Sequence, residues 1–418
     1  MAQNPQAPDG GWIAEKLRAL AAFTDVPGQL TRLTLSPAHR AAAAALKTWF
    51  EAAGLATSLD ALGTLVGRVE GEAADARTLL VGSHVDTVRD AGVYDGALGV
   101  IVGLAALDHL RRAGPALPFA VELLAFADEE GVRFPTTMTG SRALAGRLDA
   151  NALDERDAQG VSRRQALRDF GAPEGEVAPR AAADTLGYVE VHIEQGPLLE
   201  AEGLPLGLVT AINGATRGEV RVVGEAGHAG TLPMAMRRDA LAAAAEMILA
   251  IEARAAGELG LVATVGQIHV DYGAVNVVPG ACAFSLDLRA PGDARRLAAI
   301  GDLRATVAAI AARRKVGVEV ALAYDAPGAP CDPGLMEAMA QAMRRCGCAD
   351  FKLASGAGHD AMAFRGVLPM AMLFVRCKGG VSHNPAEYAS PEDMGLAARV
   401  LVEFLRVLAA RERQATPP

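Results

Sequence analysis

Two short apolar segments in the first third of the chain each run directly into a group of acidic and imidazole side chains. Residues 78–81 have the composition of a buried strand, and Gly-Ser-His-Val-Asp-Thr follows from residue 82. Residues 121–126 form a second such segment, and Asp-Glu-Glu-Gly follows from residue 128. Side chains at the carboxyl ends of strands in an α/β sheet lie where such sheets place their active sites. The pattern therefore predicts an α/β fold with a polar site at those strand ends.

The chain has 418 residues, of which 51% are hydrophobic, so it is long enough for two domains with ample cores. Helices and strands are predicted first at residues 12–22, 39–53, 56–59, 65–69, 78–81, 96–112, 121–126, 188–193 and 196–202, and again at 370–375. Residues 148–183 are charged and poor in large apolar side chains, which predicts a surface excursion of short helices.

The pattern of predicted strands and helices changes at residue 213. Strand, helix, strand, strand, helix and strand are predicted in that order, at residues 216–223, 239–256, 261–270, 281–288, 291–315 and 316–323. This order fits a four-stranded, ferredoxin-like α+β sheet covered by two helices. The proline-rich residues 324–333 are interpreted as a return linker. We therefore expect a discontinuous catalytic domain, residues 1–212 and 326–418, with residues 213–325 inserted into it.

Charge and composition exclude several classes of protein. A net charge of -9 argues against a nucleic-acid partner and against an anionic membrane surface. No apolar run approaches the ~18 residues of a membrane span, and residues 1–11 lack the pattern of a signal peptide. The five cysteines are odd in number and scattered, which fits a reducing, cytoplasmic location. Cys346 and Cys348 could clip a soft metal, but no second pair or nearby histidine supports that reading.

The residues after the first strand have the chemistry of a two-metal site. Two cations held ~3.5–4 Å apart need a bridging ligand, and a carboxylate can bind both with its two oxygens while a neutral imidazole cannot. Asp95 suits that role. His84 is assigned to one metal, and Asp86 is expected to hold the other ring nitrogen of His84. Any one of these acids could instead lie in a solvated loop, but their joint arrangement at strand ends argues against it.

The adjacent Glu129 and Glu130 divide naturally into one metal ligand and one general base. We assign Glu130 as the ligand and Glu129 as the base, although the sequence alone leaves the two roles interchangeable. His192 ends an apolar strand with Gln195 at the following turn, and His383 lies on a glycine-rich loop. A histidine at a strand end is often structural, but one further imidazole per metal would complete each ligand set.

Several segments, in the same order along the chain, resemble one branch of a known superfamily. They are Gly-Ser-His-Val-Asp-Thr at 82, Tyr-Asp-Gly at 94, Asp-Glu-Glu-Gly-Val-Arg-Phe at 128, His-Ile-Glu-Gln-Gly-Pro at 192, Gly-His-Ala-Gly-Thr at 227, and residues 276–279, 287–289, 355–362 and 382–387. The chain resembles the amidase, hydantoinase/carbamoylase branch of the di-metal aminoacylase and carboxypeptidase superfamily. That branch includes allantoate amidohydrolase, N-carbamoyl-L-amino-acid hydrolase and β-ureidopropionase.

The resemblance implies roles that spacing could not reveal. It implies the same five ligands and base as above, and it adds substrate-binding roles for Gln195, His228, Asn276, Arg289 and His359. Arg289 could grip a substrate carboxylate with Asn276 assisting, or could be an ordinary surface ion pair. His228 could stabilise the oxyanion of the reaction, and relatives deliver this histidine from a lid and dimerisation domain, in some members across a dimer interface. His109 and His269 match no motif and are assigned structural roles.

The resemblance also implies the reaction, which is hydrolysis of a ureido C–N bond. Four segments look most like allantoate amidohydrolases, so we expect allantoate to give ureidoglycine, ammonia and carbon dioxide, with N-carbamoyl-L-amino acids or β-ureidopropionate as alternatives. Family resemblance favours Mn²⁺ for the two metals, and the ligands are compatible with Zn²⁺ or Co²⁺. A small ureido-carboxylate substrate, a homodimer and hinged closure of the inserted domain are expected.

Two other classes of function were weighed against this one. A catalytically silent binder would be favoured by loss of Glu129 or of a ligand, and none is lost. A peptidase or acylase of the wider superfamily usually carries an acidic ligand where His192 stands in this chain.

Overall fold

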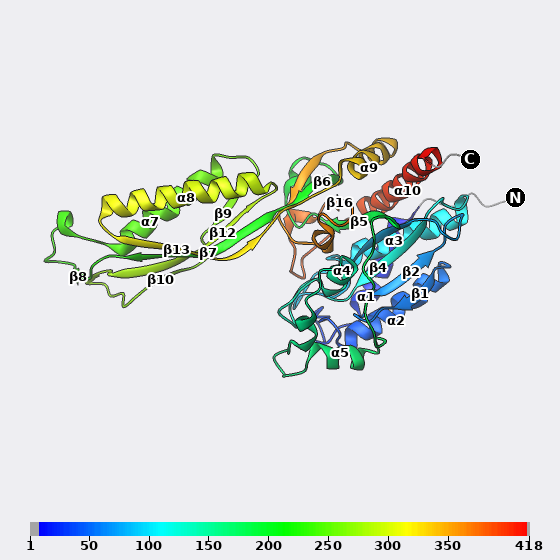
Figure 1. Ribbon diagram of the computed structural model, residues 1–418, viewed down its shortest axis with the longest axis horizontal. Coiled ribbons are helices and arrows are strands. Elements are labelled where there is room, and N and C mark those ends of the chain that lie inside the picture. Colours follow the sequence, from blue (N-terminus) through cyan, green and yellow to red (C-terminus); the bar gives the residue numbers. More distant parts are fainter. Residues whose placement is uncertain (1–7, 416–418) are drawn as a thin grey trace. The chain divides into compact units, whose positions relative to one another are not determined.

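The computed structural model describes residues 8–415 (Figure 1). The chain divides into two compact units. The first unit contains residues 8–210, 331–353 and 358–415, and the second contains residues 211–330 and 354–357. Among the helices of residues 8–415, none combines the length and the apolarity that crossing a membrane requires.

A nine-stranded mixed sheet has most of its strands in the first unit. Its strands are β1 (Ala56–Leu59), β2 (Leu65–Val69), β3 (Thr78–His84), β4 (Ala120–Phe126), β5 (Thr185–Ile193), β6 (Leu206–Ile212), β14 (Ala329–Pro330), β15 (Lys352–Ser355) and β16 (Met370–Val375). The order across the sheet is β1-β2-β4-β3-β5-β16-β6-β14, with β15 paired to β6. The central strands β4, β3, β5 and β16 run parallel to one another. Every residue of β3, β4 and β16 is buried, as expected for parallel strands covered on both faces.

Helices cover both faces of this sheet. They are α1 (Gly10–Ala21), α2 (Pro37–Ala52), α3 (Ala97–Ala113), α4 (Thr139–Leu144), α5 (Arg163–Phe170), α6 (Leu198–Ala201), α9 (Pro333–Arg345) and α10 (Pro391–Ala415), with 3-10 turns η1 (Ala150–Asp154), η3 (Asp360–Phe364) and η4 (Lys378–Gly380). Helix α2 begins two residues before its predicted range, because Ser36 caps it by accepting from the His39 amide and proline occupies its first turn. The largest core cluster joins α1, α2, α3, α9 and α10 to one face of the sheet.

The second unit is an antiparallel sheet with two long helices on one face (Figure 1). Its elements are β7 (Gly214–Val223), β8 (Gly227–His228), η2 (Met234–Met236), α7 (Ala240–Ala256), β9 (Val262–Thr264), β10 (Ile268–Val270), β11 (Val277–Val278), β12 (Ala281–Ala290), α8 (Asp293–Arg314) and β13 (Gly317–Ala326). The strand order is β10-β12-β7-β13, with β9 also paired to β12, while β8 and β11 form a separate two-stranded ribbon. Buried apolar residues alternate with exposed polar ones along β7 and β12, so the face opposite the helices is polar.

One sequence prediction about the elements was wrong, and others were incomplete. The strand predicted over residues 261–270 is broken into β9 and β10, because the amides of Gly266 and Gln267 donate to the Ser285 hydroxyl instead of continuing the ladder. Residues 324–333, interpreted as a return linker, contain the boundary between the two units after Pro330, but they also contain the end of β13 and the short strand β14, which pairs with β6. Strand β6 and helices α9 and α10 were not predicted.

Candidate metal centre

The parallel strands bring four separate segments of the chain to one end of the sheet. His84 is the last residue of β3, and His192 is the last but one of β5. Glu129 and Glu130 follow the end of β4, and His383 lies in the loop after β16. Because the carboxyl ends of parallel strands meet at one edge of the sheet, residues nearly 300 positions apart become neighbours.

Asp95 lies at the centre of these residues and is shared by two groups of potential metal ligands. Its Oδ1 atom is 3.4 Å from His84 Nε2 and 3.1 Å from His192 Nε2. Its Oδ2 atom is 3.3 Å from His383 Nε2, which is also 3.6 Å from Glu130 Oε2. The structure therefore brings together the five predicted ligands as two sets of three that share one carboxylate.

The hydrogen bonds of the two buried histidines leave the correct nitrogen of each ring for a metal. His84 Nδ1 lies 3.0 Å from the Asp86 carbonyl oxygen, and His192 Nδ1 lies 2.9 Å from the Ile193 carbonyl oxygen. A carbonyl only accepts, so each Nδ1 carries the proton and donates it. The Nε2 atom of each ring, which faces Asp95, is then unprotonated, as a metal ligand requires, and that of His192 also accepts from the Gly96 amide at 3.2 Å.

The charges at this centre also fit bound cations. Burial by itself would raise the pKa of Asp95, but the close imidazole rings of His192, His383 and His84 lower it well below its usual range. Burial and the nearby Asp95 carboxylate raise the pKa of Glu130 to about 7. The Glu130 Oε1 atom is buried and has no hydrogen-bond partner among the described residues. A divalent cation would satisfy this oxygen and favour the ionised form of the carboxylates.

Backbone geometry aims two of the site residues. Gln195 has φ 57° and His383 has φ 54°, both in the left-handed region that side chains rarely adopt. Gln195 Nε2 donates to Asp95 Oδ2 at 3.0 Å, so this strained turn presents the amide to the shared carboxylate. Gly96 has φ 63°, and a Cβ there would lie 2.4 Å from the His84 ring, so only glycine can follow Asp95 without displacing a ligand.

The Asp86 side chain does something different from its predicted role. Its carboxylate accepts from the amides of Glu129, at 3.0 Å, and Glu130, at 3.2 Å, while its distance to His84 Nδ1 is 3.5 Å. The His84 ring is held more closely by the Asp86 main-chain carbonyl. The Asp86 carboxylate therefore positions the main chain of the two glutamates, a contact that the spacing did not predict.

The structure distinguishes between the two adjacent glutamates. Glu130 lies in a ligand group with Asp95 and His383, and Glu129 lies outside both groups that contain Asp95. Burial and the Glu130 carboxylate raise the pKa of Glu129 well above its usual range, although the charge of His84 acts to lower it. A carboxylate beside the ligands with a raised proton affinity has the chemistry of a general base.

His359 is more buried than a substrate-binding residue would be expected to be. Its side chain is only 1% exposed, and its ring packs edge-on against His192 at a centroid distance of 4.5 Å. Burial, together with the charge of His192, lowers the pKa of His359 well below its usual range. In this structure His359 supports a ligand ring, in addition to any contact it makes with substrate.

Two polar residues around Asp95 were missed from the sequence. Glu387 accepts the amides of Tyr94, at 2.9 Å, and Asp95, at 3.0 Å. Ser382 lies between the two carboxylates, with its hydroxyl 3.2 Å from Asp95 Oδ2 and 3.1 Å from Glu387 Oε2. Both belong to the matched segment at residues 382–387, which was the available signal, but no spacing rule connects Glu387 to an aspartate 292 residues earlier.

Glu190 and Asp360 form a buried acidic pair behind the ligands, and it was also missed. Both are 0% exposed, and each accepts a serine hydroxyl, from Ser83 at 3.0 Å and from Ser141 at 2.6 Å. Glu190 also accepts the Ala361 amide at 3.1 Å and so ties β5 to the 3-10 turn that carries Asp360. The sequence gives no signal for Glu190, because alternation along a strand buried on both faces does not single out one residue.

The three other predicted substrate residues belong to the second unit. His228 and Asn276 are exposed neighbours on the small ribbon, where His228 pairs with Val277 and the Ala229 amide donates to the Asn276 carbonyl. His228 Nδ1 accepts from the Gly230 amide at 3.1 Å. The proton of the neutral ring is therefore on Nε2, which is free to donate a hydrogen bond.

Arg289 lies at the opposite end of the same unit. The ribbon is next to the Ala281 end of β12, while Arg289 is at the other end of that strand, about 27 Å away at ~3.4 Å per residue. That separation is much longer than a ureido acid. His228 and Arg289 of one chain therefore cannot touch the same small substrate, whatever position the unit takes.

His109, His269 and the cysteines do not belong to the ligand groups found within residues 8–415. His269 is exposed and 3.5 Å from an Asp271 oxygen, and His109 is a half-buried residue of α3. All five cysteines are free thiols, and the ligand groups found within residues 8–415 include neither Cys346 nor Cys348.

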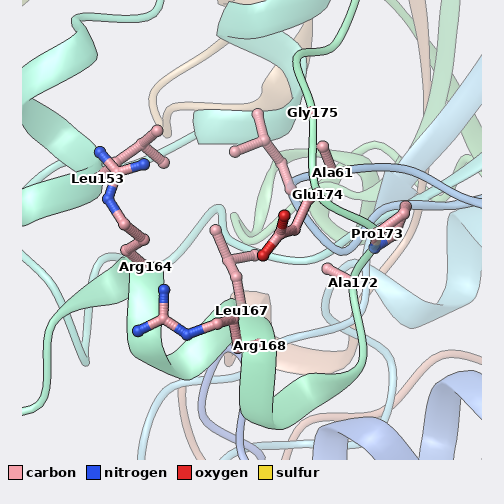
Figure 2. A pocket seen from close by; sticks show the side chains of 10 residues that line it. Ala61, Leu153, Arg164, Leu167, Arg168, Ala172, Pro173, Glu174 and Gly175 are labelled. Carbon is pink, nitrogen blue, oxygen red and sulfur yellow. The ribbon is translucent and has the colours of Figure 1, made fainter.

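Figure 2 shows a hollow of about 320 Å³ elsewhere in the first unit. Leu153 and Leu167 contribute apolar lining, and Arg164 and Arg168 contribute two guanidinium groups. None of its lining residues is a predicted site residue. The preceding residue of α5, Arg163, is buried and makes an ion pair with Asp128, so this helix braces the segment that leads into the two glutamates.

The chain is similar to several known proteins over most of its length. A model of peptidase family M20/M25/M40 matches residues 80–407. Allantoate deiminase from Arabidopsis thaliana is 39% identical over 426 residues, covering 93% of this chain and 81% of that protein. N-carbamoyl-L-amino acid amidohydrolase from Geobacillus stearothermophilus is 39% identical over 387 residues, covering 92% and 95%. An amidase of the hydantoinase/carbamoylase family from Burkholderia multivorans has a similar structure, with a TM-score of 0.90 at 32% identity over 96% and 97% of the two chains.

Proposed function

The chain belongs to peptidase family M20/M25/M40, and on that basis we propose that it hydrolyses the ureido C–N bond of allantoate. The membership confirms the resemblance noted in the sequence, the fold class, and the prediction of a metal-dependent hydrolase acting on C–N bonds. The observation that carries the reaction is the shared Asp95 between two donor groups, with Glu129 beside them. Allantoate is favoured because four segments of the sequence resemble those of allantoate amidohydrolases.

N-carbamoyl-L-amino-acid hydrolysis is the second candidate. Its support is specific, because the Geobacillus amidohydrolase is as similar to this chain, at 39%, as the Arabidopsis allantoate deiminase. Both substrates carry one carboxylate near a ureido group, so the metal centre alone does not discriminate between them.

A peptidase of family M20 from Bacillus subtilis with a similar fold is described as binding two metal ions, and the donors here suit two divalent cations. His84 and His192 would hold one and Glu130 and His383 the other, with Asp95 between them. When bound, these ions would polarise the ureido carbonyl and make a water molecule more acidic. Mn²⁺ is our proposed metal, with Zn²⁺ and Co²⁺ compatible with the same mixed imidazole and carboxylate ligands.

The residues of the chain supply the proton transfers and the orientation. Glu129 takes a proton from the attacking water on a carboxylate oxygen and returns it to the leaving nitrogen. Arg289 binds the substrate carboxylate. His228 and Asn276, which lie too far from Arg289 in the same chain, act from a second copy of the chain: His228 Nε2–H donates a hydrogen bond to the oxygen that gains charge, and Asn276 assists at the carboxylate. Gln195 holds the Asp95 carboxylate in place. The carbamate released decomposes to ammonia and carbon dioxide, and allantoate leaves ureidoglycine.

A panel of ureido acids tests the proposed reaction. Metal-free enzyme reconstituted with Mn²⁺, Zn²⁺ or Co²⁺ is given allantoate, N-carbamoyl-L-amino acids and 3-ureidopropionate, and ammonia release is measured. We expect the highest kcat/KM with allantoate and Mn²⁺. A higher kcat/KM for a carbamoyl amino acid or for 3-ureidopropionate would make that compound the substrate in place of allantoate. If no compound were turned over with any metal, the result would favour a silent ligand-binding homologue.

We also propose that the active enzyme is a homodimer formed through the second unit. Strand β10 is at the free edge of its sheet, and large apolar side chains near it are exposed, with Ile268 at 49%, Tyr272 at 98% and Val275 at 106%. Exposed apolar groups beside a free strand edge are typical of a subunit interface. A second copy would also supply the His228 and Asn276 that lie too far from Arg289 in the same chain, and closure of the hinged unit would bring these groups to the substrate.

Mixing two inactive variants tests whether the partner contributes His228. We expect His228→Ala and Glu129→Gln, each nearly inactive alone, to recover about a quarter of the native activity after subunit exchange, since half of the dimers then hold one intact composite site. Sedimentation measures the dimer in parallel. A monomer at all concentrations, or a mixture no more active than its components, would contradict this arrangement.

The state of the five cysteines supports a proposal about the cellular location. All five cysteines are free, and three of them are buried, so they have no disulfide to stabilise the fold. Free thiols in this number suit a reducing compartment. We therefore propose a cytoplasmic enzyme.

A further inference from the structure

The polar face of the second unit carries a hollow of about 670 Å³ around Arg289. Its charged lining residues are Arg217, Asp287 and Arg289. All three point from the same face of the sheet, because Asp287 and Arg289 are two apart on β12 and Arg217 is the direct cross-strand partner of Asp287 on β7. The charges are thus arranged in a row across neighbouring strands.

Asp287 holds the Arg289 guanidinium in a fixed orientation. Arg289 Nε donates to Asp287 Oδ1 at 2.8 Å and Nη2 donates to Oδ2 at 3.0 Å, which is a two-pronged ion pair. Nη1 donates to the Gly356 carbonyl at 2.8 Å. The orientation of the Arg289 side chain is therefore determined by three hydrogen bonds that it donates to groups of the same unit, before any ligand arrives.

The same ion pair creates a problem for an anion site. A carboxylate that holds an arginine also neutralises it, so the Arg289 and Asp287 pair alone has no net charge with which to attract a substrate carboxylate. Arg217 removes this problem. Its Nε donates to Asp287 Oδ2 at 2.8 Å, and its guanidinium lies 5.1 Å from the Tyr324 ring centroid, so it is itself fixed on both sides.

We infer that Arg217 is a positioning and specificity residue that leaves the Arg289 site with one net positive charge, and that the hollow selects substrates with a single carboxylate. The two guanidinium groups and one carboxylate sum to +1. Asp287 orients the Arg289 guanidinium, Arg217 compensates the negative charge of Asp287, and Arg289 contacts the substrate carboxylate. This inference rests on the proposed function only for the identity of the substrate.

A pair of matched variants on β7 measures the effect. Arg221 is on the same strand and face, is 45% exposed against 49% for Arg217, and donates to Asp271 at 2.6 Å, away from the hollow. We expect Arg217→Gln to raise KM for the carboxylate substrate about tenfold at low salt, with a much smaller change in kcat. The increase should shrink at high salt, Arg217→Lys should restore most of the loss, and Arg221→Gln should behave as native enzyme.

A double variant separates charge balance from direct contact. Asp287→Asn in the Arg217→Gln background restores the sum to +1 and should recover part of the lost affinity. If Arg217 instead touched the substrate itself, the second change would recover nothing. That result, or equal effects of Arg217→Gln and Arg221→Gln, would overturn the inference.

A binding measurement keeps this test independent of turnover. Millimolar propionate, the simplest probe with one carboxylate and an apolar group, should shift the Arg289 Nε–H resonance in the native enzyme and in Arg221→Gln, and shift it less in Arg217→Gln. If propionate bound in this way while no ureido acid was hydrolysed, the proposed reaction would fail and the anion site would stand. If propionate left Arg289 unperturbed in the native enzyme, the anion site would fail even with normal turnover of allantoate.

Discussion

Glu129→Gln is expected to keep both metal ions and lose about 10²–10⁴-fold in kcat. The amide has nearly the same shape as the carboxylate but cannot accept and return a proton. Glu129 lies outside both ligand groups that contain Asp95, and its main-chain amide is held by Asp86 in either form, so the surrounding geometry should survive. Single-turnover kinetics with metal analysis of the same sample measures both properties.

Glu130→Gln is the matched control, since the two glutamates are adjacent and both amides bind Asp86. We expect this variant to lose one metal, because Glu130 lies with Asp95 and His383 in a ligand group. Excess metal should restore part of its activity, whereas no metal concentration should rescue Glu129→Gln. A reversed outcome, with metal lost from Glu129→Gln and retained by Glu130→Gln, would exchange the two roles.

Arg289→Ala is expected to weaken carboxylate substrates by roughly 30-fold in kcat/KM, which corresponds to about 2 kcal/mol. Removing one partner of a charged contact can cost up to ~5 kcal/mol when the pair is fully buried. The lower end is expected here because the Arg289 side chain is 32% exposed and water can partly replace it. Steady-state kinetics with allantoate gives the value.

A neutral analogue, in which an amide replaces the carboxylate, provides the control for that variant. Its turnover should be slow in native enzyme and nearly unchanged by Arg289→Ala. Equal losses on both compounds would make Arg289 a structural residue that keeps β12 in place through Asp287 and Gly356. Thermal unfolding of the variant distinguishes a disturbed second unit from a lost contact.

Local signals in the sequence were strong where chemistry and secondary structure coincide. An apolar strand followed at once by a histidine or paired acids predicts strand-end ligands, and His84, Glu130 and His192 are at strand ends in the structure. Asp95 could be assigned as a bridge because only a carboxylate has two oxygens for two metals. The order of elements in residues 213–325 was likewise readable, since alternation and helical periodicity are local properties.

The tertiary structure alone decided how distant groups combine. Glu387 holds the Asp95 amide across 292 positions, and the Asp287 carboxylate binds two arginines from different strands, contacts that depend on strand pairing rather than on spacing along the chain. The separation of His228 from Arg289 likewise depends on the length and register of β12. The sequence by itself therefore predicted the side chains that we propose carry the chemistry, while the pairing of strands decided which of them one chain can bring to the same substrate, because distances across a sheet are set by register and not by residue number.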